Sequence, residues 1–197
     1  MAEPALMNSG KAGPEGGTSS AGLLIRTMRI RQWTKNVFVL SPLLFSKHLF
    51  DLDIVVHAIA GFFLFSMIAS AIYVLNDIVD AEIDQQHPVK KLRPIASGSL
   101  SPRIAGIAVT ILVPLTLGIS WLVHSGFAVV LLAYFLLNVV YSFVLKKAVI
   151  IDVMTIAASF VLRIVARAVI IDVPISEWLL ICTSLLALFL GFSKRRH

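Results

Sequence analysis

The amino-acid sequence predicts an all-α protein, a polytopic bundle of transmembrane helices. Of its 197 residues, 58% are hydrophobic and only 14% are charged, and the mean hydropathy is +0.90. Ordinary soluble domains carry about 25% charged residues, so this composition excludes that class. Uncharged runs at residues 54–75, 104–123 and 127–145 also match the roughly 20 residues that cross a bilayer as a helix. A helix satisfies its own backbone polar groups in lipid, and we therefore expect these runs to be membrane spans.

The N-terminal part is predicted to lie outside the membrane core. Residues 1–22 are rich in Gly, Ala, Ser, Pro and Glu and lack both apolar periodicity and the hydrophobic stretch of a signal peptide. We expect a disordered tail there, followed by one membrane domain over residues 23–197. In residues 23–36, apolar side chains mix with basic ones and with Trp33, a pattern typical of an amphipathic segment at the membrane interface.

Six crossings are predicted, and the basic residues assign their direction. The first crossing, residues 36–50, is short for a bilayer and contains Pro42 and Lys47. The later crossings are residues 54–75, 104–123, 127–145, 148–171 and 178 onward. When the first is counted, the basic clusters at residues 26–35, 90–103, 146–147 and 194–196 share one side, and only Lys47 lies opposite. The positive-inside rule makes that side cytoplasmic, and we expect a multi-pass protein of the plasma membrane.

This topology also accounts for nearly all of the net charge of +6, so the sequence gives no reason to expect a nucleic-acid partner. The expected environment is a lipid bilayer. Cys182 is the single cysteine and lies in an apolar run, which indicates a packing thiol. The sequence leaves homo-oligomerisation open, because lipid removes the hydrophobic drive between apolar helix faces.

An acid-rich stretch, residues 76–98, follows the second predicted span. On a helix with about 100° per residue, Asn76, Asp80 and Asp84 fall at roughly 0°, 40° and 80°, and Asp77 falls near 100°. Four oxygen-bearing side chains therefore share one face. Glu82 falls at roughly 240° and is predicted to point away.

This face suits a hard cation, because Mg²⁺ prefers oxygen ligands and binds through one or two carboxylates together with substrate phosphates. The pair His87-Pro88 should end the helix, and the bases after it, Lys90, Lys91 and Arg93, can fold back toward phosphate oxygens. Two other interpretations stay open: solvated loop charges with ordinary positive-inside bias, and a cation transporter with an acidic selectivity ring. A cation path would avoid neighbouring lysines and arginines.

Arg163 and Arg167 lie in the fifth predicted span, where a charged side chain is costly. They are interpreted either as contacts for a polar substrate or as structural residues. In the structural interpretation Arg167 snorkels to the outer interface near Asp172, and Arg163 is bonded to backbone carbonyls. Neither is included among the predicted catalytic residues.

Two motifs resemble those of a known family. Asn-Asp-x-x-Asp-x-x-x-Asp at residues 76–84, followed by Arg-Pro-x-x-x-Gly at 93–98, is similar to the first signature of the UbiA-type membrane prenyltransferase superfamily. Tyr-Ser-x-x-Leu-Lys at 141–146, before Asp152, is similar to its next signature. Arg-Gln-Trp-Thr-Lys-Asn at 31–36 and the string at 87–98 resemble the branch that transfers phosphoribose to decaprenyl phosphate. The resemblance runs from about Arg29 to the end.

The resemblance implies Mg²⁺-dependent transfer of 5-phosphoribose from phosphoribosyl diphosphate to a polyprenyl (decaprenyl) phosphate. Diphosphate is released, and the product supplies precursors of cell-wall arabinan. The resemblance assigns the Mg²⁺–diphosphate ligands to Asn76, Asp80 and Asp84, and the catalytic carboxylates to Asp77, Asp80 and Asp84. The implied phosphate contacts are Lys35, Lys90, Arg93, Tyr141 and Lys146.

A close alternative keeps the fold but transfers a prenyl group from a polyprenyl diphosphate to an aromatic acceptor, using the same acid motif. By fold analogy the superfamily has about nine helices, whereas this chain ends at Lys194-Arg195-Arg196-His197. We therefore expect it to lack roughly the last third of the bundle and part of the phosphate site, and to be poorly active alone.

Overall fold

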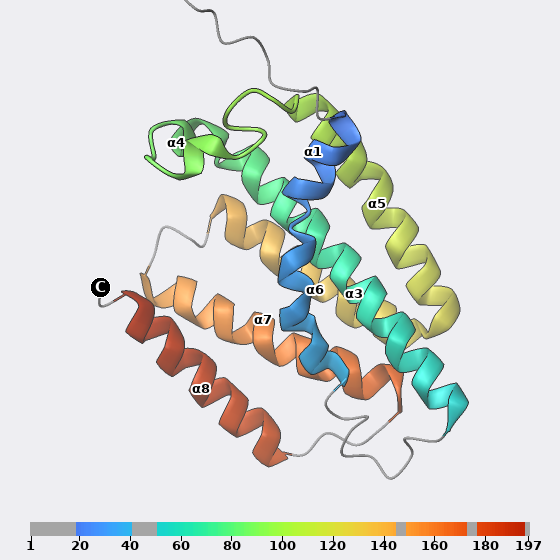
Figure 1. The fold of residues 1–197 in the computed structure, drawn as a ribbon. Helices are drawn as coiled ribbons and strands as arrows, with labels where there is room; N and C mark the ends of the chain where they lie inside the picture. The colour runs from blue at the N-terminus through green and yellow to red at the C-terminus, as the bar shows by residue number, and fades with distance from the viewer. Residues whose placement is uncertain (1–18, 41–50, 145–148, 173–176, 196–197) are drawn as a thin grey trace, which may run out of the picture.

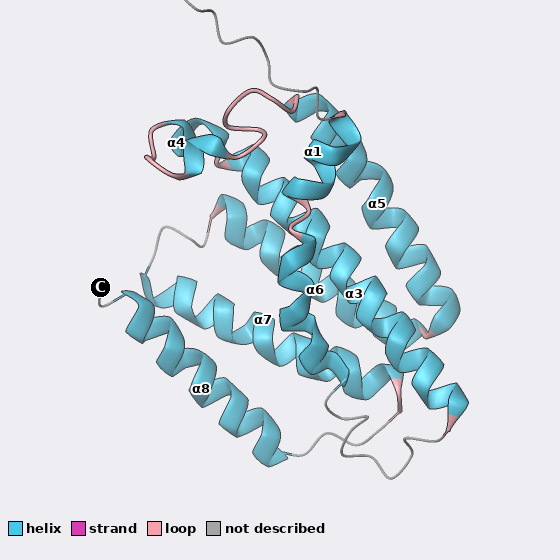
Figure 2. Cartoon of the chain, in the orientation of Figure 1, coloured by secondary structure: helices cyan, strands magenta, loops and turns pink. Residues whose placement is uncertain are grey.

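The computed structural model describes residues 19–40, 51–144, 149–172 and 177–195. All regular structure in these ranges is helical (Figure 2). The elements are α1 (Ser20–Thr27), the 3₁₀ helix η1 (Ile30–Leu40), α3 (Leu52–Val79), α4 (Ala81–Gln85), the 3₁₀ turn η2 (Lys90–Leu92), α5 (Pro102–Val123), α6 (Ser125–Phe143), α7 (Val149–Ile170) and α8 (Glu177–Arg195).

The long helices form a bundle in which α3 is central. Helix α3 packs against α5, α6, α7 and η1, and α7 packs against α6 and α8. Figure 1 shows α1, α4, the end of α3 and the start of α5 together at one end of the bundle. The acid-rich stretch therefore lies at this end, beside the N-terminal segment.

Side-chain caps fix where the long helices begin. The Asp51 carboxylate accepts a hydrogen bond from the backbone N–H of Asp53 at the start of α3, and the Ser101 hydroxyl does the same for Arg103 at the start of α5. The His124 ring accepts from the N–H of Phe127 at the start of α6. Each cap satisfies one of the backbone N–H groups that a helix leaves unpaired in its first turn.

The core lies between α3, α6 and α7, where Phe65, Ile68, Leu131 and Ala166 are almost fully buried. Many large apolar side chains on the outer helix faces are exposed, including Leu122 on α5. In a bilayer these faces contact lipid tails, so their exposure agrees with a membrane protein.

The predicted fold class is confirmed, because four helices are long and apolar enough to cross a membrane: α3, α5, α6 and the Ile150–Ile170 part of α7. The apolar part of α8, Leu180–Ser193, is shorter. Of the predicted first crossing, residues 41–50 lie outside the described residues, and residues 36–40 belong to η1.

The predicted tail lies mostly outside the described residues, but its boundary at residue 22 is wrong. Helix α1 already begins at Ser20. The cause is a local cap, because the Ser19 hydroxyl accepts a hydrogen bond from the N–H of Ala21 at 3.2 Å.

Gly191 on α8 is a point of close helix contact. A Cβ there would lie 2.7 Å from Cγ1 of Val153 on α7, and Val153 is fully buried and has a stiff β-branched side chain. We expect Gly191→Ala to cost about 1–3 kcal/mol of stability through overpacking and to lower the midpoint of thermal unfolding in detergent. The matched control is Gly118→Ala on α5, where a Cβ meets nothing within 4 Å. Equal shifts for the two variants would contradict the close-packing argument.

Candidate functional site

The acid-rich motif spans the junction of two helices. Helix α3 ends at Val79 and α4 begins at Ala81, with Asp80 between them at φ −92° and ψ 2°. The predicted continuous helix over residues 76–84 is therefore interrupted. The backbone hydrogen bonds from Asp80 N–H to the Asn76 carbonyl (2.9 Å) and from Asp84 N–H to the Asp80 carbonyl (2.8 Å) nevertheless keep the helical spacing.

The acids differ sharply in burial. Asp77 and Asp84 are 3% and 2% exposed, whereas Glu82 is exposed, as the helical wheel predicts. The helical spacing maintained across Asp80 brings Asp77 and Asp84 to the same side of the chain. Burying two carboxylates requires compensating positive charge, which the structure supplies.

Arginines from two distant segments bind these carboxylates. Arg29 Nη2 donates to Asp77 Oδ1 at 2.6 Å, and Arg93 Nη1 lies 3.2 Å from the same oxygen. Arg93 Nη1 also donates to Asp84 Oδ2 at 2.5 Å. Lys90 Nζ lies 4.0 Å from Asp84 Oδ1. Arg93 thus links the two buried acids, because the turn after α4 folds back onto the motif.

The participation of Arg29 was not predicted, because the sequence indicates only a basic residue at the membrane interface. It lies between α1 and η1 with a φ of 53°, in the left-handed region that non-glycine residues seldom adopt. This turn places its guanidinium against Asp77 and 5.2 Å from the centre of the Tyr73 ring. Since 48 residues separate Arg29 from Asp77, no local pattern could have paired them.

A cavity of about 410 Å³ opens beside these ion pairs. We call it the basic cavity; its charged and polar lining residues are Arg26, Thr27, Arg29, Gln32, Asp77, Lys90 and Arg93. Four cationic side chains and one carboxylate give it an excess of positive charge. The lining comes from the α1–η1 segment, the end of α3 and the segment after α4.

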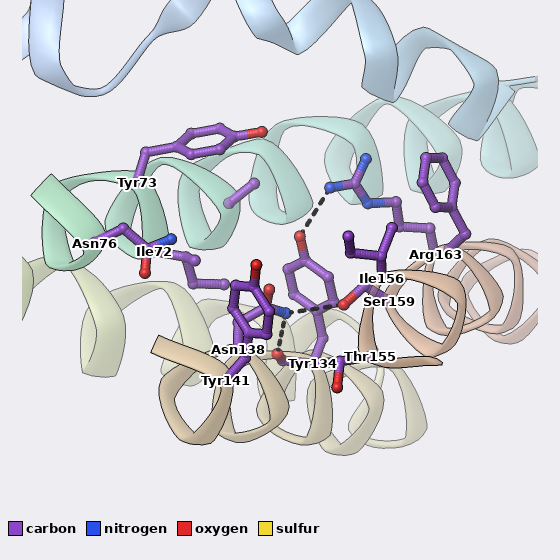
Figure 3. A pocket seen from close by; sticks show the side chains of 12 residues that line it. Ile72, Tyr73, Asn76, Tyr134, Asn138, Tyr141, Thr155, Ile156, Ser159 and Arg163 are labelled. Carbon is purple, nitrogen blue, oxygen red and sulfur yellow. Dashed lines mark hydrogen bonds between the residues drawn. The ribbon is translucent and has the colours of Figure 1, made fainter. Parts of the chain in front are cut away.

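A second cavity, of about 200 Å³, lies between α3, α6 and α7 (Figure 3). We call it the inner cavity; its polar lining residues are Tyr73, Asn76, Tyr134, Asn138, Tyr141, Thr155, Ser159 and Arg163. Arg163 lies 14 residues after the first residue of α7, about 21 Å along the helix. The inner cavity therefore extends from the acid-motif end toward the middle of the bundle.

Hydrogen bonds tie the walls of the inner cavity together. Asn138 Nδ2 donates to the Tyr134 carbonyl at 2.8 Å and lies 3.4 Å from Ser159 Oγ, as Figure 3 shows. Ser142 donates its hydroxyl to the Asn76 side-chain oxygen. The predicted metal ligand Asn76 thus faces the inner cavity and α6, whereas its neighbour Asp77 faces the basic cavity. Two consecutive residues at the end of α3 therefore line two different cavities.

The two arginines of the fifth predicted span differ from the structural interpretation. Arg163 Nη2 donates to the Tyr134 hydroxyl at 2.9 Å, not to a backbone carbonyl, and its guanidinium lies 5.4–5.7 Å from the ring centres of Phe65, Tyr134 and Phe160. Arg167 is only 7% exposed, so the prediction that it snorkels to the interface is wrong. Tight packing of α7 in the bundle encloses it.

Tyr134→Phe should remove only the hydroxyl that accepts from Arg163, because the ring and its packing on Phe65 are retained. We expect a loss of about 1–3 kcal/mol, since a charged donor loses its partner away from water. Denaturant unfolding in detergent measures it. In the double variant Tyr134→Phe/Arg163→Met the loss should be smaller than the sum of the two single losses. Additive losses would show that the hydrogen bond does not stabilise the protein.

Oxygen donors suited to Mg²⁺ are present, but they do not form a cage. No group of three or more His, Cys, Asp or Glu side chains in the described ranges is placed to hold a metal ion. Mg²⁺ commonly binds through one or two carboxylates plus substrate phosphates. The oxygen atoms of Asp80, Asp84 and the Asn76 amide are donors of the type that such a site uses. The neighbouring lysine and arginine side chains would then contact the phosphate groups of the substrate.

The remaining predicted phosphate contacts that the structure describes line two different cavities. Lys90 and Arg93 line the basic cavity, and Tyr141 lines the inner cavity. The side chain of Lys35 and the whole of Lys146 lie outside the part of the chain that the structure describes. Among the residues that sequence reasoning missed are Arg29, Tyr134, Asn138 and Ser142; the last lies within the Tyr-Ser-x-x-Leu-Lys motif.

Comparisons with known proteins agree with this architecture. The chain is 34% identical over 176 residues to the decaprenyl-phosphate phosphoribosyltransferase of Mycolicibacterium smegmatis, covering 87% of this chain and 55% of that protein. It is 36% identical over 177 residues to the protein of the same name from Corynebacterium glutamicum, covering 87% and 53%. The chain thus spans about half the length of these relatives.

A solved structure has a similar fold. The structure of a UbiA homolog from Archaeoglobus fulgidus bound to DMAPP and Mg²⁺ matches with a TM-score of 0.69 at 21% identity, covering 84% of this chain and 60% of that one. The model of the UbiA prenyltransferase family matches residues 37–194. That match covers most of the chain, and the protein belongs to the UbiA prenyltransferase family.

Proposed function

We propose that the protein transfers 5-phosphoribose from phosphoribosyl diphosphate to a polyprenyl phosphate such as decaprenyl phosphate, releasing diphosphate. The observation that carries the proposal is the presence of two unlike cavities lined by the consecutive residues Asn76 and Asp77. One is strongly basic and lies at the end of the bundle, and the other continues between membrane-spanning helices. A soluble anionic donor and a membrane-held acceptor need two such cavities, one basic and one between membrane-spanning helices. The names of the relatives from M. smegmatis and C. glutamicum support the same reaction.

The proposed reaction depends mainly on electrostatic stabilisation by the protein. As the bond from ribose C1 to the diphosphate oxygen breaks, its electron pair leaves with the diphosphate and C1 becomes oxocarbenium-like, as at a glycosidic centre. An oxygen of the lipid phosphate forms the new bond to C1. This oxygen is already anionic, so no strong general base is required.

Cations near the motif would stabilise the leaving group more in the transition state than in the ground state. Lys90, Arg93 and Arg29 are the cations closest to the buried carboxylates. Mg²⁺, held by Asn76, Asp80 and Asp84, would neutralise the charge that develops on the diphosphate. In this proposal Asp77 orients Arg29 and Arg93 rather than binding the ion.

The proposal also covers where the protein acts and which pathway its product supplies. In this proposal the acid-motif end of the bundle lies at the cytoplasmic face of the plasma membrane, where it can bind soluble phosphoribosyl diphosphate. The distribution of the basic clusters supports this orientation. The product would be a lipid-linked pentose phosphate for cell-wall arabinan.

Prenyl transfer to an aromatic acceptor is the second candidate, because the A. fulgidus homolog binds DMAPP and Mg²⁺. The basic cavity favours the first candidate, because phosphoribosyl diphosphate and a polyprenyl phosphate together carry more anionic phosphate groups than a prenyl diphosphate and an aromatic acceptor. A cation transporter is disfavoured, because four cationic side chains line the cavity beside the acid motif, and a cation path would avoid them.

The test incubates membranes containing the protein with labelled phosphoribosyl diphosphate, decaprenyl phosphate and Mg²⁺. The C. glutamicum relative serves as the positive control. Label entering the lipid phase, at a lower rate than in the control, is the expected result. A lipid phase without label, together with no binding of labelled phosphoribosyl diphosphate to the purified protein, would exclude the proposed function. Labelled dimethylallyl diphosphate with 4-hydroxybenzoate tests the second candidate.

A further inference from the structure

The basic cavity contains more positive charge than its carboxylate neutralises. Arg29, Arg93 and Lys90 lie against two carboxylates, those of Asp77 and Asp84, so one unit of positive charge is left uncompensated. Arg26 also lines the cavity, is exposed and forms no ion pair with any described residue. Charge-assisted hydrogen bonds to phosphate are among the strongest that a protein makes, and arginine suits them especially well.

Arg29 and the segment that carries it are held in place by the fold. The left-handed backbone at Arg29 directs its side chain to α3, and such strain persists only where the surroundings enforce it. Farther along η1, Trp33 Nε1 donates to Ser70 Oγ at 2.9 Å and Asn36 Nδ2 donates to Ser66 Oγ at 3.0 Å. The α1–η1 segment is thereby fastened to α3, so an incoming anion meets preorganised donors.

The basic cavity is also distinct from the predicted metal ligands. Asn76 faces the inner cavity, and of the motif's acids only Asp77 lines the basic cavity, where two guanidinium groups bind it. Arg93 and Lys90 of this cavity also contact Asp84, but the four cationic side chains of the lining can bind an anion directly. The anion that enters is therefore one that needs no metal ion as a bridge, unlike a Mg²⁺-bound diphosphate.

We propose that the basic cavity is a metal-independent binding site for a phosphate monoester, with Arg26 and Arg29 as its specificity-determining residues. This inference rests on the proposed function, in which two substrates carry such a group: the 5-phosphate of the sugar donor and the phosphate of the polyprenyl acceptor. A prenyl diphosphate with an aromatic acceptor has no phosphate monoester. The site therefore distinguishes a phosphoribosyl transferase from other members of the fold.

The experiment measures binding to the purified 197-residue chain in lipid nanodiscs with EDTA present. Inorganic phosphate and ribose 5-phosphate are titrated calorimetrically, and farnesyl phosphate is added to the nanodisc lipid as a competitor. Arg26→Gln should weaken phosphate binding at least about tenfold, because a charge-assisted contact is lost. Arg26 makes no ion pair in the described structure, so this variant should fold. Arg29→Gln should also weaken phosphate binding.

The matched control is Arg31→Gln, which removes one positive charge from an exposed residue of η1 that does not line the cavity. Competition by ribose 5-phosphate alone assigns the site to the donor, and competition by farnesyl phosphate assigns it to the acceptor. Binding that requires Mg²⁺, or equal losses in Arg26→Gln and Arg31→Gln, would overturn the inference. Because no turnover is measured, this result is independent of whether phosphoribosyl transfer occurs.

Discussion

Asp80→Ala should lower Mg²⁺-dependent phosphoribosyl transfer by about 100-fold or more, the size of effect that follows loss of one preorganised electrostatic group. Asp80 lies at the junction of α3 and α4 and is partly exposed, so a carboxylate oxygen there is accessible to an ion that also binds diphosphate. The measurement is the initial rate of label transfer into the lipid phase, normalised to protein amount. The residual rate should no longer rise when the Mg²⁺ concentration is increased.

Glu82→Ala is the matched control, because it removes a carboxylate two residues away that is exposed. It should retain most of the transfer rate and its dependence on Mg²⁺. If both variants lose activity equally, the acids act as general surface charge, and the assignment of Asp80 to a metal site is wrong.

The second large effect is on stability. Arg93→Gln removes the guanidinium that links the carboxylates of Asp77 and Asp84, which are 3% and 2% exposed. Leaving buried charge without its partner costs about 3 kcal/mol. We expect a corresponding decrease in the free energy of unfolding, measured with denaturant in detergent. Arg103→Gln, at an exposed arginine near the start of α5, should change it by less than about 0.5 kcal/mol.

A double-mutant cycle isolates the interaction energy between Arg93 and Asp84 from the other contacts of each residue. Asp84→Asn keeps the shape of Asp84 but removes its charge, so in the Arg93→Gln background it should cost less than in the wild-type chain. If the two losses simply add, the Arg93–Asp84 contact at 2.5 Å contributes nothing to stability. Lys90, whose Nζ is 4.0 Å from Asp84, would then be the more important cation.

Much of the fold could be predicted because lipid imposes simple rules on sequence. A run of about 20 apolar residues becomes a helix whatever its neighbours are, and α3, α5, α6 and α7 all follow this rule. Helix ends depend instead on local caps. The Ser19 cap starts α1 before the predicted boundary.

The site was harder to predict than the fold. Helical spacing was enough to place Glu82 away from Asp77 and Asp84, since it depends only on the number of residues between them. The burial of Arg167 and the contact of Arg163 with Tyr134 depend on how α6 and α7 pack. The pairing of Arg29 with Asp77 depends on a backbone turn that no residue type in the segment demands, because arginine has no preference for positive φ.

The separation of 48 positions between Arg29 and Asp77 also determines when the site can assemble during biosynthesis. At a synthesis rate of about 5–20 residues per second, Asp77 follows Arg29 by roughly 2–10 seconds. Arg93 is made another 16 residues later. The N-terminal segment can therefore be fastened to α3 only after α3 has been synthesised, although this can precede the synthesis of α5, α6, α7 and α8.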